Sequence, residues 1–250
     1  MIKRDYPVAA QFHAGTTYIT GNLPAPGTLE SGLKPYKEYP NSPGVKLPRL
    51  DIPKAFIYDV LLARQSSRDF NNQPVELNQL NNILFAGYGS RNSIKEENNS
   101  SSERPAPSAG GLYPLELYVL VMNMKGLQPG IYHYHPHAPK LEFIDSNSID
   151  RQLLYHLFLQ QSWIMDASAV IIATAIMERT LSKYRDRGYR YILFEAGHVF
   201  QNMNLVATAH KIGTVNIGAF LDEEIGSLLK IDDEEKVIYA MAVGAVRPAR

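Results

Sequence analysis

The chain contains no cysteine among its 250 residues. Without thiols it cannot form disulfides, hold an iron–sulfur cluster or a cysteine-ligated zinc ion, or use a cysteine nucleophile. The absence of cysteine also fits a reducing compartment. Any oxidation chemistry in this protein is therefore not thiol chemistry.

An excess of charge is also absent, because 25 Lys and Arg residues balance 25 Asp and Glu residues. No overall field therefore draws the chain to nucleic acid or to anionic lipid. The longest apolar run, residues 167–177, is far shorter than the roughly 20 residues of a membrane helix. The first 13 residues lack the apolar stretch of a signal peptide. We expect a soluble, cytoplasmic protein with neither nucleic acid nor a membrane as a partner.

No G-x-G-x-x-G fingerprint and no P-loop motif occurs, which argues against Rossmann or Walker-type nucleotide binding. A chain that is 45% apolar and 20% charged can nevertheless build a folded core. Scattered Pro and Gly predict an extended N-terminal arm over residues 1–50, followed by one domain over residues 51–250. Residues 91–103 are almost entirely polar and predict a mobile loop that could cover a site.

Hydrophobic periodicity predicts strands that alternate irregularly with helices. The expected helices cover residues 51–64, 76–87, 189–211 and 222–229, and a further helix with Leu153, Leu154, Leu157 and Phe158 is expected to be capped by Ser148. The expected strands cover residues 115–122, 131–134, 141–144, 167–176, 214–220 and 236–243. The irregular order indicates an α+β fold rather than a regular βαβ winding. The longest of these helices is expected to cross the core.

The first candidate site segment follows the helix predicted over residues 51–64. Arg64 and Arg68 lie four residues apart with two serines, Ser66 and Ser67, between them. A guanidinium offers a bidentate fork and a hydroxyl offers a further donor, so the pattern suits a phosphate. The alternative is a solvated helix end whose cations offset the helix dipole.

The second candidate segment is the run Pro107-Ser108-Ala109-Gly110-Gly111. Small residues let a ligand approach the backbone closely and reach several N–H groups, which suits the polar edge of a planar cofactor. The alternative is an ordinary glycine-rich turn before a strand.

Two further groups of residues have a chemical and a structural interpretation. Lys183 and Tyr184 lie side by side before the long helix and suit a base and an acid, although a solvated charged loop is the alternative. The alternating histidines at positions 133, 135 and 137 lack a carboxylate at ligand spacing. We interpret them as strand residues and expect no metal site.

Together these segments resemble the FMN-dependent nitroreductase superfamily and, more narrowly, its SagB-type thiazoline/oxazoline dehydrogenase branch. The likeness runs from about residue 48 to residue 247. It rests on five blocks in order: RQSSRDF at 64–70, PSAGGLYP at 107–114, PGIYHY at 129–134, KYRDRGYRYILFEAGHVFQNM from 183, and VGAVRP at 243–248. The order and spacing of all five make the resemblance more specific than any single block.

The resemblance implies a mixed α+β sandwich with a mainly antiparallel central sheet, flanking helices and a long central helix. It also implies an intimate homodimer with FMN at the interface, in contact with both chains. The implied FMN-binding residues are Arg64, Gln65, Ser66, Arg68, Pro107, Ser108, Ala109, Gly110, Gly111, Gly244 and Arg247. Of these, Arg247 is placed to meet the phosphate, and Gln65 stands where the family is often basic.

The branch resemblance implies that Lys183 and Tyr184 are the catalytic pair in the oxidation of peptide azolines to azoles. This reaction removes a ring proton and delivers a hydride to the flavin, which passes the electrons to oxygen. The branch also implies a peptide substrate and a cyclodehydratase partner. Two alternatives stay open: a general NAD(P)H-dependent nitro- or quinone reductase, and a flavin-free scaffold subunit of a modification complex.

Overall fold

The computed structural model describes residues 6–20, 25, 27–28, 34, 36–92, 103–146 and 149–247. A seven-stranded sheet forms the centre of the fold, in the order β1-β6-β5-β3-β7-β9-β8, and every neighbouring pair is antiparallel. Its strands are β1 (Gly44–Lys46), β3 (Leu115–Val121), β5 (Gly130–His135), β6 (Lys140–Asp145), β7 (Ala169–Ile176), β8 (Ile212–Ile217) and β9 (Glu235–Ala245). A separate parallel ladder joins β2 (Val75–Glu76) to β4 (Met124–Lys125).

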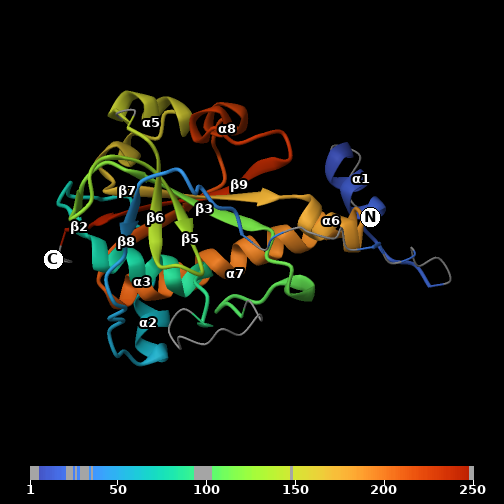
Figure 1. The fold of residues 1–250 in the computed structure, drawn as a ribbon, viewed down its shortest axis with the longest axis horizontal. Coiled ribbons are helices and arrows are strands. Elements are labelled where there is room, and N and C mark those ends of the chain that lie inside the picture. The colour runs from blue at the N-terminus through green and yellow to red at the C-terminus, as the bar shows by residue number, and fades with distance from the viewer. Residues whose placement is uncertain are drawn as a thin grey trace.

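Helices cover both faces of the large sheet (Figure 1). On one face lie α2 (Ile57–Ala63), α3 (Leu77–Tyr88) and α7 (Arg187–Ala209), and on the other lie α5 (Arg151–Leu157) and α8 (Asp222–Leu229). Within the described residues, no helix is both long enough and apolar enough to span a bilayer. The sheet and its two helical layers confirm the predicted α+β fold with a mainly antiparallel sheet.

The middle strands β3 and β7 are buried on both faces of the sheet. In β3, Leu117 and Val119 belong to the core that includes the buried side of α7, whereas Tyr118 and Leu120 belong to the core under α5 and α8. The alternation follows from the two-residue period of a strand. The uninterrupted apolar run of β7 has the same cause, since a strand covered by helices on both faces needs apolar residues on both.

The long helix α7 packs against the sheet with one side only. Ile192 and Val199 are buried on that side, whereas Leu193 is 40% and Phe194 55% exposed on the other. Gly197 lies on the exposed side, where an added β-carbon would meet no atom within 4 Å. The helix therefore runs along the core as expected, with one side buried in it and the other side open in the single chain.

Among the described residues of the first 50, the prediction of an extended arm is wrong at one helix, whereas β1 is extended. α1 (Pro7–Gly15) is a helix, with proline in its first turn where the fixed φ is favourable. It lies against α7 through an edge-to-face contact between Phe12 and Tyr189, with ring centres 5.9 Å apart. β1 joins the edge of the main sheet beside β6. These contacts are tertiary, which is why periodicity did not reveal them.

The loop predicted over residues 91–103 lies largely outside the described residues, because residues 93–102 are not described. Its two described ends are close together. The Arg91 backbone N–H donates to the Glu103 carbonyl at 2.9 Å, and the two side chains form an ion pair at 3.4 Å.

Candidate functional site

Two of the predicted segments meet at the amino end of α7. Lys183 and Tyr184 are the last residues of α6 (Glu178–Tyr184), a helix rather than the solvated loop considered as an alternative. A β-carbon on Gly110 would lie 2.7 Å from the Tyr184 hydroxyl and 2.9 Å from Lys183 Nζ. Both polar tips therefore face the bare backbone of Gly110. The Tyr184 ring is fixed by an edge-to-face contact with Tyr191, with ring centres 5.1 Å apart.

The loop that carries Gly110 has an unusual backbone. Gly110 and Gly111 have φ values of +66° and +67°, and Tyr113 has a φ of +48°. Such left-handed values are readily adopted by glycine and cost free energy for tyrosine. The Tyr113 N–H donates to Ser108 Oγ at 2.9 Å and the Gly111 N–H donates to the Ser108 carbonyl at 3.1 Å, so Ser108 closes the loop. Pro107, Gly110 and Gly111 remain exposed.

A buried carboxyl group lies beneath this loop and was missed by the sequence reasoning. Glu195 of α7 is 3% exposed, accepts a hydrogen bond from the Tyr88 hydroxyl at 2.9 Å and lies close to the Ser108 hydroxyl. Burial raises the pKa of Glu195 to about 7, although hydrogen bonds from Ser108 and Tyr88 and the charges of Arg104 and Arg179 oppose the shift. The signal in the sequence is its place in the block that begins at residue 183, within the letters FEAGH.

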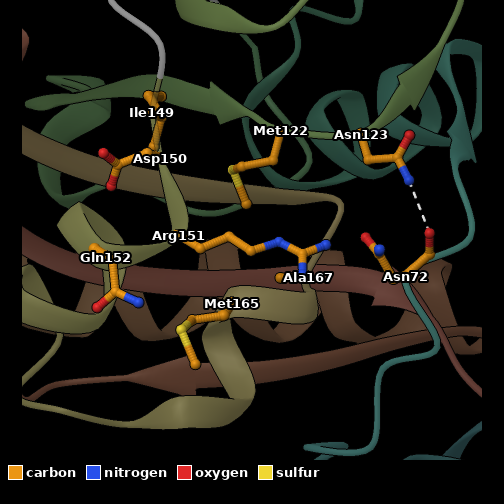
Figure 2. Close-up of a pocket in the computed structure, with 9 residues that line it drawn as sticks. All are labelled: Asn72, Met122, Asn123, Ile149, Asp150, Arg151, Gln152, Met165 and Ala167. Carbon is orange, nitrogen blue, oxygen red and sulfur yellow. Dashed lines mark hydrogen bonds between the residues drawn. The ribbon is translucent and has the colours of Figure 1, made fainter.

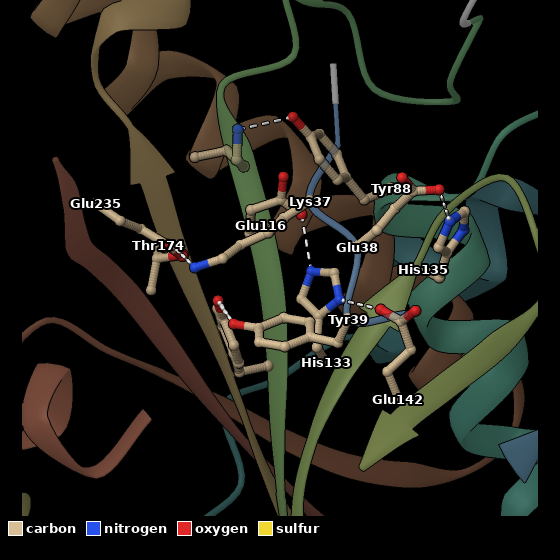
Figure 3. A network of polar contacts seen from close by, with 12 residues as sticks. Lys37, Glu38, Tyr39, Tyr88, Glu116, His133, His135, Glu142, Thr174 and Glu235 are labelled. Atoms are coloured by element: carbon tan, nitrogen blue, oxygen red, sulfur yellow. Dashed lines mark hydrogen bonds and ion pairs between the residues drawn. The ribbon is translucent and has the colours of Figure 1, made fainter. Parts of the chain in front are cut away.

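A buried ionic network anchors α6 to the sheet. Figure 3 shows its members Glu116, His133 and Glu142. Arg179 of α6 pairs with Glu116 of β3 at 2.7 Å, and Glu116 in turn lies 2.9 Å from His133 Nε2. His133 Nδ1 lies 2.9 Å from Glu142. Burial by itself disfavours the imidazolium, but hydrogen bonds and charges from the two carboxylates outweigh it and raise the pKa of His133.

The carboxylates of this network have lowered pKa values. For Glu142, burial acts to raise the pKa, but hydrogen bonds from His133 and Lys140 lower it to about 2. His133 is a strand residue, as predicted. Its position between the carboxylates of Glu116 and Glu142 was not predicted, because the two glutamates come from other strands. Within the described part of the chain, no group of three or more His, Asp or Glu side chains is arranged to hold a metal ion.

The remaining predicted segments meet near the carboxyl end of α7. The Ser67 N–H donates to the Thr214 carbonyl at 2.8 Å, and the Asn71 N–H donates to the Ala245 carbonyl at 3.0 Å. Gly244 is buried, and a β-carbon there would lie 2.7 Å from the Phe70 ring. Backbone bonds and this close approach place residues 64–70 beside the end of β9.

The cations of this second group lie at the surface. Gln65, Ser66 and Arg68 are exposed and Arg64 is half-buried. Among the described residues, neither Arg64 nor Arg68 pairs with a carboxylate, whereas Arg247 lies 3.8 Å from Asp69 in an exposed pair. The arrangement leaves guanidinium groups available to an anion, which agrees with a phosphate site.

The two groups of residues are separated along α7. Tyr184 packs on Tyr191, whereas Thr214 donates its hydroxyl to Asn204 at 2.7 Å. Asn204 follows Tyr191 by 13 residues, which corresponds to about 20 Å along a helix. Figure 1 shows α6 and the C-terminus at opposite ends of the molecule. The predicted residues of one chain therefore lie in two separate groups rather than in a single pocket, and we call these groups the Lys183 half-site and the Arg64 half-site.

The described surface also has a cavity of about 620 Å³ that contains none of the predicted residues. Figure 2 shows the Arg151 side chain extending between Met122 and Met165 in this cavity. A smaller cavity of about 460 Å³ borders α6 and is lined in part by Arg179, Lys37 and Glu235. Only the second lies next to the helix that carries Lys183 and Tyr184.

The Nitroreductase family matches residues 61–245 of this chain. The chain therefore belongs to the nitroreductase family of oxidoreductases. The protein named "Putative nitroreductase" from Methanocaldococcus jannaschii is 40% identical over 200 residues, covering 80% of this chain and 95% of that protein. The microcin B17-processing protein McbC from Escherichia coli is 32% identical over 149 residues, covering 56% of this chain and 53% of McbC.

Solved structures share the fold. A structure titled as a putative nitroreductase from Anabaena variabilis matches with a TM-score of 0.75 and 28% identity, over 94% of this chain and 46% of the other. The Escherichia coli microcin synthetase McbBCD complex, with truncated pro-MccB17 bound, matches with a TM-score of 0.62 and 22% identity, over 96% of this chain and 92% of the other. Together with the sequence likeness to McbC, these findings support the SagB-like branch of the superfamily.

Proposed function

We propose that this nitroreductase-family protein is an FMN-dependent dehydrogenase that oxidises azoline rings in peptides to azoles. The observation that carries the proposal is the convergence of the Lys183 amine and the Tyr184 hydroxyl on the Gly110 backbone. The reaction needs a base and a second proton-transferring group beside the reacting ring. This pair supplies both, next to an exposed glycine-rich loop. The sequence likeness to McbC, a microcin-processing protein, favours a peptide substrate and a cyclodehydratase partner.

The residues of both half-sites fit FMN. A β-carbon on Gly110 would fill the space in front of Lys183 Nζ and the Tyr184 hydroxyl, so glycine keeps this cradle open for a planar group. We assign the ring-binding role to residues 107–111. The other half-site supplies the cations that we assign to the phosphate, Arg64, Arg68 and Arg247. Ser66 is a further donor, and Gln65, between Arg64 and Ser66 in the sequence, is assigned to the same group. Gly244 supports them by admitting the Phe70 ring.

We infer that a complete site requires two copies of the chain. The half-sites lie about 20 Å apart along α7, and the open side of this helix carries Leu193, Phe194 and Gly197. α2 adds further exposed apolar side chains, including Phe56 at 81% and Leu62 at 70%. Exposed apolar surface of this extent is typical of an interface. Pairing through these helices would bring the Lys183 half-site of one copy towards the Arg64 half-site of the other.

Within that site, Lys183 and Tyr184 would do different work. Bound FMN supplies the two-electron acceptor for the hydride that leaves the azoline ring. The Lys183 amine is the proposed acceptor of the ring proton. The Tyr184 hydroxyl, held in place by the contact of its ring with Tyr191, orients the substrate or the lysine by hydrogen bonding. The backbone of Gly110 limits how far either group can move.

The first test is the visible spectrum of the purified protein, followed by NAD(P)H without air. We expect FMN absorption bands that NAD(P)H does not bleach. Lys183→Ala should retain FMN and lose azoline oxidation by at least about a hundredfold, as expected for loss of a general base. Lys236→Ala, which removes an exposed lysine, is the matched control. Undiminished turnover in Lys183→Ala would overturn the catalytic assignment.

The test of the two-copy site is the molar mass in solution together with FMN titration. Leu193→Asp should give a monomer whose affinity for FMN is at least about tenfold lower, because a buried charge opposes pairing. Leu159→Asp changes another exposed leucine, 49% accessible and remote in sequence from α7, and should leave both properties unchanged. A wild-type monomer that binds FMN tightly would contradict the inference.

A general NAD(P)H-dependent nitro- or quinone reductase is the second candidate, favoured by the likeness to the Methanocaldococcus jannaschii protein over 95% of its length. Rapid bleaching of the bound flavin by NAD(P)H, with turnover of a nitroaromatic acceptor, would support it. A colourless protein that also refuses added FMN would instead support a flavin-free scaffold subunit.

A further inference from the structure

Glu195 occupies a position that the proposed chemistry does not use. Its carboxyl group is buried in the face of α7 that packs on the sheet side of the fold, and it is 3% exposed. An isolated carboxylate at such a depth is costly unless hydrogen bonds compensate it. The partners that compensate it come from two other segments, Tyr88 at the end of α3 and Ser108 at the start of the glycine-rich loop.

The hydrogen bonds around Glu195 have a fixed direction. The Tyr88 hydroxyl accepts from the Leu115 N–H at 2.9 Å and donates to Glu195 at 2.9 Å. Ser108 Oγ accepts from the Tyr113 N–H at 2.9 Å, so its single proton is available to the nearby Glu195 carboxylate. Glu195 thereby determines where both hydroxyl protons point. Through the Tyr88 and Ser108 hydroxyls, Glu195 is connected to the backbone N–H groups of Leu115 and Tyr113, where the loop leads into β3.

The loop needs such support because its conformation is costly. Residues 110, 111 and 113 all have positive φ, and Tyr113 has a side chain that disfavours it. The Arg104 guanidinium lies 3.9 Å from the centre of the Tyr88 ring and 4.6 Å from the centre of the Tyr113 ring, and Arg179 donates to the Tyr113 carbonyl at 3.3 Å. These contacts hold Tyr113, whereas Ser108 is held through Glu195.

We propose that Glu195 is a positioning residue that acts through the Ser108 hydroxyl to hold the 108–113 loop in the conformation that places Gly110 against Lys183 and Tyr184. The part of this inference that concerns FMN rests on the proposed function. The part that concerns the loop does not, since it follows from the contacts of this chain alone.

The ionisation of Glu195 agrees with this role. The groups that face it are Tyr88 from α3, Ser108 and Arg104 from the segment before β3, and Arg179 from α6. Burial brings the pKa of Glu195 to about 7. A protonated Glu195 is neutral and has one good acceptor oxygen instead of two, so it accepts from the two hydroxyls more weakly than the carboxylate does. The loop should therefore be held more tightly above neutral pH than below it.

The test is amide hydrogen exchange of the peptide that spans residues 105–114, measured in the purified full-length protein. Glu195→Gln keeps the shape of the side chain but can accept from the two hydroxyls with one oxygen only. We expect exchange in this peptide to be at least fivefold faster than in the wild type at pH 8. Glu223→Gln, which changes an exposed carboxyl group on α8, should exchange as the wild type does.

Ser108→Ala and the double variant make the test specific. Ser108 is only partly buried, so Ser108→Ala is expected to fold even if Glu195→Gln does not. If Glu195 acts through Ser108, both single variants accelerate exchange to a similar extent and the double variant adds less than twofold. Unchanged exchange in Ser108→Ala, or fully additive effects in the double variant, would overturn the proposal.

FMN titration separates this inference from the proposed function. We expect both single variants to bind FMN five- to tenfold more weakly than the wild type, with the affinity of the wild type rising between pH 6 and pH 8 and that of Glu195→Gln remaining flat. If the variants exchange faster than the wild type but the wild type itself binds no FMN, the positioning role is supported and the flavin assignment is contradicted. Normal FMN binding with unchanged loop exchange in the variants would contradict the positioning role alone.

Discussion

The two ends of α7 are held by different kinds of interaction. At the amino end, the Lys183 half-site depends on buried charged side chains, with Arg179 paired to Glu116 at 2.7 Å and Glu195 bonded to Tyr88 at 2.9 Å. At the carboxyl end, the Arg64 half-site depends on backbone bonds such as that from Ser67 to Thr214 at 2.8 Å. The Lys183 half-site is therefore positioned by particular side chains and depends on their ionisation. The Arg64 half-site is positioned by hydrogen bonds of the backbone, which do not depend on ionisable side chains.

The largest effect should follow from breaking the buried network of the amino end. His133→Phe leaves Glu116 and Glu142 without the imidazole between them, and removing one partner of a buried pair costs about 3 to 5 kcal/mol. We expect a loss of about 3 kcal/mol or more in the free energy of unfolding, measured by urea denaturation.

The exposed pair between His156 and Glu224, at 2.7 Å, gives the matched control. His156→Gln should cost at most about 1 kcal/mol, as is typical of surface pairs. Equal losses in the two variants would show that the buried network does not support the amino end.

The second effect is a dependence of stability on pH. The pKa of Glu195 is about 7 in the folded chain, above its ordinary value of 4.5. The folded state therefore binds the proton more tightly than the unfolded state, and stability is lost as the pH rises from 4.5 to 7. A difference of this size corresponds to about 3 kcal/mol at most.

Glu195→Gln removes the titrating group, so its free energy of unfolding should fall less between pH 5 and pH 8 than that of the wild type. Comparing the two proteins cancels the other carboxyl groups, including Glu142, whose lowered pKa acts below pH 4.5. Parallel pH profiles would contradict the raised pKa.

A smaller effect should distinguish two consequences of adding a β-carbon in the 108–113 loop, which are backbone strain and contact with neighbouring side chains. Gly110→Ala and Gly111→Ala both place a β-carbon at a φ near +66°, which costs about 1 to 2 kcal/mol. Only the first places it against Lys183 Nζ and the Tyr184 hydroxyl, because nothing lies within 4 Å at Gly111. We expect similar losses of stability and a turnover at least tenfold lower for Gly110→Ala than for Gly111→Ala. Equal turnover would show that the approach of the two side chains to Gly110 does not matter.

The smallest effect on the free energy of unfolding is expected for a substitution in the Arg64 half-site, near the carboxyl end of α7. Arg68 is exposed and its closest described ring contact is with Trp163 at 5.7 Å. Arg68→Ala should change the free energy of unfolding by less than about 0.5 kcal/mol, yet weaken FMN binding about tenfold by removing a phosphate contact. Arg151→Ala removes another exposed arginine, 3.8 Å from Asp166, and should leave FMN binding unchanged. Calorimetric titration of both variants would reveal whether the guanidinium binds the phosphate.

Most of the secondary structure could be predicted from the sequence. The helix predicted over residues 76–87 is observed as Leu77–Tyr88, and the apolar run that begins at Ala167 contains the strand Ala169–Ile176. Periodicity succeeds here because each element buries a regular face. It failed for Pro7–Gly15, a helix with no buried residue, which therefore leaves no periodic pattern.

The sequence determined the candidate site less completely than it determined the secondary structure. The residue types alone suggested a phosphate at Arg64 and Arg68 and a base and acid at Lys183 and Tyr184, because these chemistries depend on functional groups that the sequence names directly. The sequence could not show that the Gly110 backbone lies against the Lys183 and Tyr184 tips, since the contact joins positions more than 70 residues apart.

The sequence by itself determined the α+β class, the family and the chemical groups available for a reaction, because these depend on local patterns and on the types of residue present. Only the tertiary structure decided that these groups form two half-sites at opposite ends of α7, and that Glu195 is buried beneath the 108–113 loop. Both facts depend on which distant segments share one environment, and a carboxyl group acquires a pKa of about 7 only when that environment excludes water.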